Sequence, residues 1–324
     1  MAVSFAAFQG LVMAAAFVFP GQGSQAVGMG KALAEAFAAA QQVFAEVDAA
    51  LGEPLSEIIW NGPAETLTLT ENAQPALMAV SLAAFRVLET EAGVDLPRDA
   101  AFVAGHSLGE YSALAAARSL TIADAARLLR IRGRAMQKAV PVGVGAMAAL
   151  IGVELDAAKA IATEAGGICA AANDNGGRQV VLSGEKSAVE RAVEIAKVHG
   201  VKRAMMLPVS APFHCPLMQP AADAMAEALS GVAVKVPRIP LVANVLAEPA
   251  SDPAVIVRCL IAQVTGTVRW RESVVFMTQA GVTKFYEVGA GKVLAGLIRR
   301  IAATASATSI GTPEDVVRFK VERG

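Results

Sequence analysis

Two hydrophobic patterns alternate along most of the chain. Short, mostly apolar runs are typical of buried strands, and longer segments with apolar residues at helical spacing are typical of amphipathic helices. We expect strands at 14–19, 101–104, 240–245 and 283–288. Helices are expected between and after them, at 31–51, 73–92, 107–117, 121–140, 253–264, 270–280 and 289–301. This alternation predicts an α/β fold for most of the sequence.

The pattern changes in the middle of the chain, where the elements become short and closely spaced. Strands and helices follow there in the order βαββαβ, which is the ferredoxin-like arrangement. The expected elements are 147–153, 155–165, 168–172, a turn at 173–178, 180–183, 185–199 and 201–209. Prolines flank both junctions, so an insertion is the simplest explanation. We therefore predict a large α/β domain of residues 14–142 and 212–324, interrupted by a ferredoxin-like small domain of residues 143–211.

The composition narrows the possible functions. Of 324 residues, 55% are apolar, which is enough for a sizeable core, and 28 basic residues balance 29 acidic ones. This balance disfavours nucleic acid or a membrane surface as the main partner. Three scattered cysteines without a C-x-x-C motif fit reduced thiols in the cytoplasm. Three histidines without an H-E-x-x-H motif give no pattern for a metal site.

The N-terminal segment is largely apolar, so an export signal has to be considered. It has no Lys or Arg before Lys31, and Gln9-Gly10 interrupts the apolar run, which argues against a signal peptide. Met13 offers a second start, and we expect residues 1–13 to be an extension without a role. Elsewhere charges interrupt every apolar run long enough to span a membrane, so no transmembrane segment is expected.

A serine lies in a glycine-bounded turn between a predicted strand and a predicted helix. The segment Gly105-His106-Ser107-Leu108-Gly109 fits G-x-S-x-G, the pattern of a sharp bend that exposes a serine hydroxyl at a helix N-terminus. Backbone N–H groups and the helix dipole at that position stabilise negative charge. We interpret Ser107 as a nucleophile; the alternative is an ordinary turn in which Ser107 only caps the helix.

Two other glycine-rich loops follow strands. The loop Pro20 to Gln25 satisfies the relaxed dinucleotide fingerprint, but no second strand ends on an acidic residue at the required distance, so a Rossmann site is disfavoured. The loop does expose backbone N–H groups beside a strand end. Gly289 to Lys292 is not a P-loop, because Tyr286 and Val293 stand where glycine and Ser or Thr are required.

One arginine of the helix at 121–140 falls on its apolar face. At 100° per residue, Arg127, Arg130 and Arg134 share a face, whereas Arg132 lies roughly opposite, among leucines and Met136. A buried guanidinium stays charged and needs an anion. The helix alone leaves two partners open for Arg132, a protein carboxylate or a ligand carboxylate.

A histidine lies in a loop bounded by prolines, Pro212 to Pro216. His214 in such a loop is a candidate functional residue. We interpret the adjacent Cys215 as a small buried thiol, because neighbouring residues seldom converge as nucleophile and base. His106 is expected to pack beneath the serine, and His199 to face solvent at a helix end.

Taken together, these segments resemble the malonyl-CoA:acyl carrier protein transacylase family. The resemblance runs from about Ala15 to the C-terminal region and rests on an ordered set of motifs, FPGQGSQ, GHSLGEYSAL, RGRAMQ, PFHCPLM and YEVGAGKVLAGLI. It implies a hydrolase-like α/β domain interrupted by a ferredoxin-like one, in agreement with the predicted segments.

The resemblance also implies a role for each matching residue. Ser107 would be the acylated nucleophile and His214 its base, and Arg132 would hold the malonyl carboxylate. The implied supporting roles are an oxyanion hole of the Gln22 and Leu108 backbone N–H groups, a histidine-orienting carbonyl at Gln263, and selection against methylmalonyl by Phe213.

The implied activity is transfer of malonyl from malonyl-CoA to the phosphopantetheine thiol of acyl carrier protein, supplying fatty acid synthesis. No cofactor or metal is implied, and we expect a monomer in the cytoplasm. Acidic carrier proteins would dock on basic residues, with Lys202, Arg203, Arg299 and Arg300 as candidates. The alternatives are a polyketide acyltransferase, a serine thioesterase or esterase, and a silent docking subunit.

Overall fold

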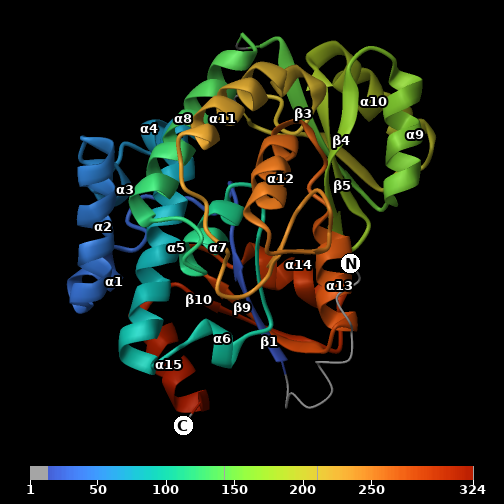
Figure 1. Ribbon diagram of the computed structural model, residues 1–324. Helices are drawn as coiled ribbons and strands as arrows, with labels where there is room; N and C mark the ends of the chain where they lie inside the picture. Colours follow the sequence, from blue (N-terminus) through green and yellow to red (C-terminus); the bar gives the residue numbers. More distant parts are fainter. Residues whose placement is uncertain (1–13, 142, 210, 324) are drawn as a thin grey trace.

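The computed structural model describes residues 14–141, 143–209 and 211–323, which form two β-sheets surrounded by helices (Figure 1). The predicted extension at 1–13 lies outside these residues. The fold class expected from the sequence is confirmed: a large domain with a mainly parallel sheet carries a small domain with an antiparallel sheet. The exact domain boundaries stay a prediction.

The larger sheet has six strands in the order β10-β9-β1-β2-β7-β8. Every pair is parallel except β7 with β8. The strands are β1 (Ala14–Phe19), β2 (Phe102–Gly105), β7 (Leu241–Val242), β8 (Pro249–Ala250), β9 (Val282–Val288) and β10 (Ser306–Ile310). All residues of β1 are buried, because helices cover both faces of a parallel sheet.

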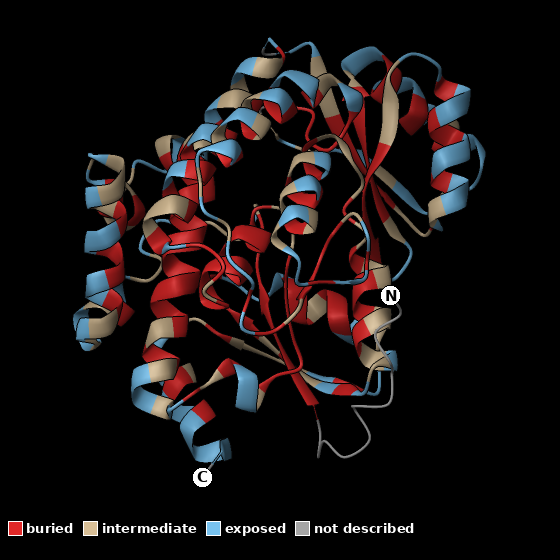
Figure 2. Cartoon of the chain, in the orientation of Figure 1, coloured by how far each residue is buried: buried red, intermediate tan, exposed pale blue. Residues whose placement is uncertain are grey.

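Helices pack on both faces of this sheet, and β1 shows the division. Phe17 and Phe19 point into one apolar cluster with α2, α5, α7, α8, α11 and α12, and Ala16 and Val18 point into the other with α13 and α14. The helices are α1 (Lys31–Ala36), α2 (Ala38–Leu51), α3 (Leu55–Asn61), α4 (Ala64–Thr68), α5 (Thr70–Ala92), α6 (Leu96–Asp99), α7 (Gly109–Ala116), α8 (Ile122–Ala139), α11 (Gln219–Ser230), α12 (Pro253–Thr265), α13 (Trp270–Gln279), α14 (Val293–Ile301) and α15 (Pro313–Arg323). The buried residues concentrate at the centre of the large domain (Figure 2). None of the described helices combines the length and apolarity that crossing a membrane requires.

The smaller sheet is antiparallel, with strand order β4-β5-β3-β6. Its elements are β3 (Gly145–Ile151), α9 (Leu155–Ala165), β4 (Cys169–Gly176), β5 (Gln179–Glu185), α10 (Lys186–Val198) and β6 (Arg203–Met206). The predicted order βαββαβ is confirmed. Leu150 and Leu182 pack beneath α9 and α10, whereas Met147 and Ala149 face a cavity shared with the large domain.

The predicted turn at 173–178 is too long, because β4 continues to Gly176 and the turn comprises only Gly177 and Arg178. The middle of β4 pairs with the large domain. Val268 N–H donates to Ala172 O at 2.8 Å, and Asp174 N–H donates to Val268 O at 2.9 Å. An ion pair of 2.8 Å between Arg271 and the buried Asp174 reinforces the junction. Backbone pairing with another part of the chain, which a local pattern cannot reveal, therefore keeps this segment extended.

Other differences concern the ends of elements. The predicted helix at 31–51 is two helices, because Phe37 adopts an extended conformation between α1 and α2. Two predicted strands, 201–209 and 240–245, shorten to β6 and β7. The sequence analysis did not predict α3, α4, α6, α11, β8, β10 and α15.

Arg127 and Arg134 are exposed, but Arg130 on the same helix face is buried. Its guanidinium forms a 2.6 Å ion pair with Glu53 and donates to the Glu71 carbonyl at 2.7 Å. The connection after α2 and the start of α5 thus cover a face of α8 that the helical pattern alone leaves open to solvent.

Two helical glycines provide a test of packing against helix propensity. A Cβ at Gly133 in α8 would lie 2.5 Å from the Glu71 Cα, whereas a Cβ at Gly296 in α14 has nothing within 4 Å. We expect Gly133→Ala to lower the free energy of unfolding by about 1 to 3 kcal/mol through overpacking. Gly296→Ala should raise it by up to about 1 kcal/mol through helix propensity. Urea denaturation of both variants measures the difference; equal stabilisation would contradict the close α5–α8 contact.

Candidate active site

Ser107 lies in a bend that two glycines make possible. A Cβ at Gly105 would lie 1.9 Å from the Gly109 carbonyl carbon, and a Cβ at Gly109 would lie 2.3 Å from the Phe19 carbonyl oxygen. The chain therefore turns directly from β2 into α7, and Ser107 takes a φ of 53°, in the left-handed region that residues with a Cβ rarely adopt. The bend projects the Ser107 hydroxyl beyond the end of the strand.

Asn244 holds this strained bend in place. The Ser107 N–H donates to Asn244 Oδ1 at 2.8 Å, and Asn244 Nδ2 donates to the Gly105 carbonyl at 2.7 Å. Asn244 is fully buried and follows β7, the strand beside β2. The sequence analysis did not identify it, although a polar residue directly after a buried strand was a usable signal.

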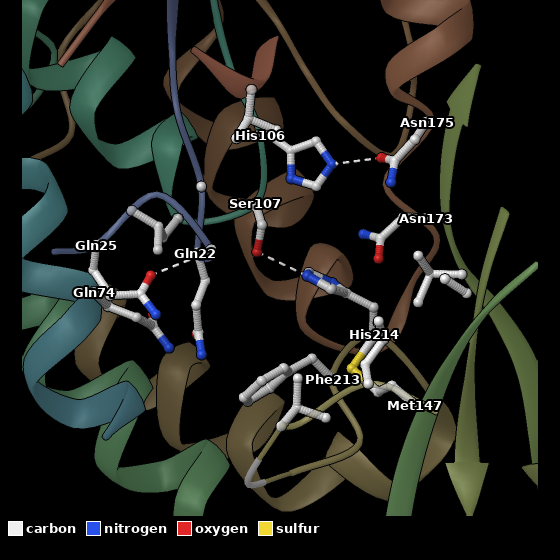
Figure 3. A pocket seen from close by; sticks show the side chains of 18 of the residues that line it. Gln22, Gln25, Gln74, His106, Ser107, Met147, Asn173, Asn175, Phe213 and His214 are labelled. Atoms are coloured by element: carbon white, nitrogen blue, oxygen red, sulfur yellow. Dashed lines mark hydrogen bonds between the residues drawn. The ribbon is translucent and has the colours of Figure 1, made fainter. Parts of the chain in front are cut away.

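His214 contacts the Ser107 hydroxyl. Its Nε2 lies 2.7 Å from Ser107 Oγ (Figure 3), and its Nδ1 lies 2.8 Å from the Gln263 carbonyl oxygen. A carbonyl only accepts, so Nδ1 carries the proton and Nε2 is free to accept one from the hydroxyl. Burial, together with the nearby Arg132 charge, lowers the pKa of His214 to about 3. The histidine is therefore neutral at physiological pH.

Arg132 is buried on the other side of the same hydroxyl. One terminal nitrogen, Nη2, donates to Ser107 Oγ at 3.1 Å and to Gln263 Oε1 at 2.8 Å, and Nη1 donates to Gln74 Oε1 at 2.6 Å. All three acceptors are uncharged, and Nε has no acceptor among the described residues. The sequence left a protein carboxylate and a ligand carboxylate open as the partner of Arg132. Among the described residues, no protein carboxylate is hydrogen-bonded to its guanidinium.

Gln263 connects the site residues to one another. Its carbonyl contacts His214 and its Oε1 contacts Arg132, while its Nε2 donates to the Ser107 carbonyl at 2.9 Å and to the Glu110 carboxylate. The other oxygen of Glu110 accepts the Asn244 N–H at 2.8 Å. Burial raises the pKa of Glu110 to about 7. Glu110 lies within the motif GHSLGEYSAL, but no role for it could be recognised from the sequence.

The oxyanion hole that the resemblance implies would consist of the backbone N–H groups of Gln22 and Leu108. Within the described part of the chain, neither Gln22 nor Leu108 donates its backbone N–H to a protein acceptor. Both residues line the same cavity as Ser107, and Leu108 immediately precedes α7. Gly21 brings the two loops together, since a Cβ there would lie 2.6 Å from the His106 carbonyl oxygen.

A cavity of about 470 Å³ opens onto Ser107 between the two domains. The large domain contributes Gln22, Gln74 and Phe213 to its wall, and the small sheet contributes Met147 and Asn175 (Figure 3). The wall therefore combines apolar side chains with amide groups that can donate and accept hydrogen bonds.

The remaining candidates of the sequence analysis lie outside this centre or serve its walls. His106 lines the cavity, with Nε2 2.9 Å from Asn175 Oδ1. His199 is exposed and pairs with Glu164 at 3.0 Å, and Cys215 is fully buried, as expected. Across residues 14–141, 143–209 and 211–323, no cluster of His, Cys, Asp and Glu could hold a metal ion.

Comparison with known proteins agrees with this geometry. The family model described as "Acyl transferase domain" matches residues 16–317. The malonyl CoA-acyl carrier protein transacylase of Salmonella typhimurium is 46% identical over 301 residues, which cover 92% of this chain and 96% of the relative.

Solved structures give the same result. The acyl-carrier-protein-S-malonyltransferase of Bartonella henselae is 57% identical, with a TM-score of 0.93 and coverage of 95% of this chain and 98% of that one. A malonyl-transacylase solved in complex with its type II PKS acyl-carrier protein is 42% identical, with a TM-score of 0.92 and coverage of 96% and 100%. The chain belongs to the malonyl-CoA:acyl carrier protein transacylase family.

Proposed function

We propose that this protein transfers the malonyl group of malonyl-CoA to the phosphopantetheine thiol of acyl carrier protein through a malonyl-serine intermediate. One observation carries the proposal: a neutral histidine and a buried guanidinium both contact the Ser107 hydroxyl, at 2.7 and 3.1 Å. The first suits a general base, and the second suits a ligand carboxylate close to the reacting atom.

The first half-reaction forms the acyl-enzyme. His214 Nε2 accepts the Ser107 proton as Oγ attacks the thioester carbon of malonyl-CoA, and the carbonyl oxygen becomes an oxyanion. The free N–H groups of Gln22 and Leu108 would stabilise this charge, which appears only in the tetrahedral state. Collapse breaks the C–S bond, and the proton on His214 leaves with the CoA thiolate as a thiol.

The second half-reaction reverses these steps with a different thiol. The phosphopantetheine thiol of the carrier protein gives its proton to His214 and attacks the Ser107 ester, and collapse returns the proton to Ser107 Oγ. CoA and the carrier protein both end in a pantetheine thiol, so one cavity of about 470 Å³ can serve the acyl donor and the acyl acceptor in turn in a ping-pong cycle.

Arg132 supports a diacid as the acyl group. A guanidinium fork pairs with a carboxylate in a bidentate geometry, and the present acceptors of Arg132 leave its charge without a counter-ion in direct contact. A thioesterase acting on neutral acyl groups would gain nothing from this buried charge, so Arg132 favours malonyl transfer over hydrolysis.

The relatives support acyl carrier protein as the partner, since one of them is solved with such a protein. All four candidate docking residues are exposed. Arg203 is on the edge strand β6, and Arg300 lies beside Gly177 after β4, at the same end of the small sheet, whereas Arg299 donates to the Ala307 carbonyl of β10 at 3.5 Å. Three strand spacings, about 14 Å, separate the positions of Arg203 and Arg300. We propose that they belong to one docking face rather than to one compact patch.

Fatty acid synthesis is the pathway that we propose, as the family resemblance implies, with a polyketide pathway as the second candidate because one relative is solved with a type II PKS acyl-carrier protein. Phe213 lines the cavity next to His214, and we propose that it excludes methylmalonyl. Phe213→Ala should then turn over methylmalonyl-CoA faster than the wild type does.

We further propose that the protein is a monomer and lies in the cytoplasm. The three free cysteines are in keeping with this compartment.

Incubation with malonyl-CoA alone tests the proposed function. We expect a stable malonyl adduct on Ser107, seen by intact mass and peptide mapping, and complete loss of the adduct in Ser107→Ala. Release of free malonate with continued turnover would indicate a hydrolase, and an unmodified protein would indicate a docking subunit.

Replacement of Arg132 tests the basis of acyl selection. Arg132→Ala should lower kcat/KM for malonyl transfer more than kcat/KM for acetyl transfer. The difference should correspond to a loss of about 2 to 4 kcal/mol in transition-state stabilisation, as for other truncated charge pairs. Acetyl transfer should persist or improve, because the acetyl group makes no use of the guanidinium. Steady-state kinetics with both CoA esters measure this, and an equal loss for both would rule out the carboxylate role.

The protonation of His214 is a second electrostatic consequence. Because burial and Arg132 both lower its pKa, His214 should stay neutral and protonated on Nδ1 at about pH 5, below the usual histidine value of 6.5. Nitrogen-15 NMR of the imidazole, assigned with His214→Ala, reports this state. In Arg132→Ala the pKa should move upward, since a positive neighbour is removed; an unchanged titration would contradict the coupling.

A further inference from the structure

A chain of buried side chains connects Arg132 to the loop that carries Gln22. Arg132 Nη1 donates to Gln74 Oε1 at 2.6 Å, and Gln74 Nε2 donates to Thr70 Oγ1 at 2.8 Å. The Thr70 hydroxyl then donates to Gln22 Oε1 at 3.0 Å. Thr70 is fully buried at the first residue of α5, and Gln22 and Gln74 lie on the same side of the cavity (Figure 3).

The direction of every hydrogen bond in this chain is determined by Arg132. A guanidinium only donates, so the oxygen of the Gln74 amide must face it and the NH₂ group must face Thr70. The Thr70 oxygen accepts from that group, which leaves its single hydrogen for Gln22 Oε1. Successive bonds oriented in one direction polarise and strengthen one another.

The loop at Gln22 is held by packing on one side, where the buried Gly21 lies close to the His106 carbonyl. On the other side Gly23 has a φ of 108°, in a region that glycine enters without strain, so the backbone there has a wider choice of conformations. Gly23 N–H donates to Gln25 Oε1 at 2.7 Å, a contact within the loop. Among the described residues, the bond from Thr70 is the one hydrogen bond of the Gln22 side chain that reaches across to another element.

We propose that Thr70 is a positioning residue for the oxyanion hole: its hydroxyl holds the Gln22 side chain and thereby aims the Gln22 backbone N–H at the oxyanion. The inference rests on the proposed function, in which that N–H stabilises the tetrahedral state. It assigns Thr70 no contact with substrate. Gln74 keeps its bond to Arg132 and a contact with Met136 Sδ at 3.6 Å when the hydroxyl is removed, so the carboxylate site should stay intact.

Thr70→Val, which keeps the shape and removes the hydroxyl, tests the proposal. We expect kcat for malonyl transfer to fall by about tenfold or more, with KM for malonyl-CoA little changed, as expected when a contact used in the transition state is misaligned. Acetyl transfer should fall by the same factor, because both acyl groups form the same oxyanion. Thr70→Ser, which keeps the hydroxyl, should retain most of the wild-type activity.

A double-mutant cycle separates positioning from general damage. Gln22→Ala keeps the backbone N–H but loses the side chain that Thr70 holds. Each single variant should show a similar loss in kcat, and the double variant should lose no more than either one, because both break the same link. Additive losses would overturn the proposal.

Thr90→Val is the matched control. Thr90 lies on the same helix α5, is exposed, and bonds only to carbonyls of its own helix. The kcat of the Thr90→Val variant should equal that of the wild type.

Equal activity of Thr70→Val and Thr90→Val, or a loss confined to malonyl transfer, would overturn the positioning role. Failure of the wild type to form the Ser107 adduct would instead reject the proposed function. If Thr70→Val unfolds, Thr70→Ser and Gln22→Ala still decide the question.

Discussion

The Arg132 guanidinium is buried 3.1 Å from the Ser107 hydroxyl, and none of its three hydrogen-bond acceptors is charged. A charge taken out of water is costly unless neighbouring groups replace its hydration. The amide oxygens of Gln74 and Gln263 do so in part, and this requirement fixes the orientation of both amides. Gln263 consequently turns its NH₂ group toward Glu110 and the Ser107 carbonyl. The charge therefore orders side chains from α5, α7 and α12 around a single point.

The two residues proposed to exchange the proton are both strained. Ser107 and His214 have φ values of 53° and 58°, conformations that cost about 1 to 3 kcal/mol each and persist only when the surroundings hold them. Asn244 supplies that restraint for the serine through two hydrogen bonds, and the Gln263 carbonyl supplies it for the histidine. The strain places two short side chains from distant loops within hydrogen-bond distance.

The sequence predicted those parts of the site that local chemistry determines. Ser107 was visible because the bend requires glycines at fixed positions, and Arg132 because helical periodicity places it among leucines. Asn244, Glu110 and Gln74 were not assigned, because each becomes part of the site through a partner far away along the chain. The same reason applies to Arg130: it shares a helix face with the exposed Arg127 and Arg134, and its burial beside Glu53 depends on a residue far away along the chain. The hydrophobic periodicity of a segment predicts its local structure, but it does not show which distant segments contact it in the fold.

Arg132 and His214 also depend on each other through charge. The positive guanidinium contributes to the lowered pKa of His214, so it opposes protonation of the base in the free protein. In the proposed reaction, a carboxylate bound to the guanidinium would cancel much of that field, and the imidazolium formed during attack on the thioester would then have a negative neighbour. An acyl group without a carboxylate would leave the field in place and meet a weaker base. Selection of a diacid and activation of the serine would then be two effects of one buried charge.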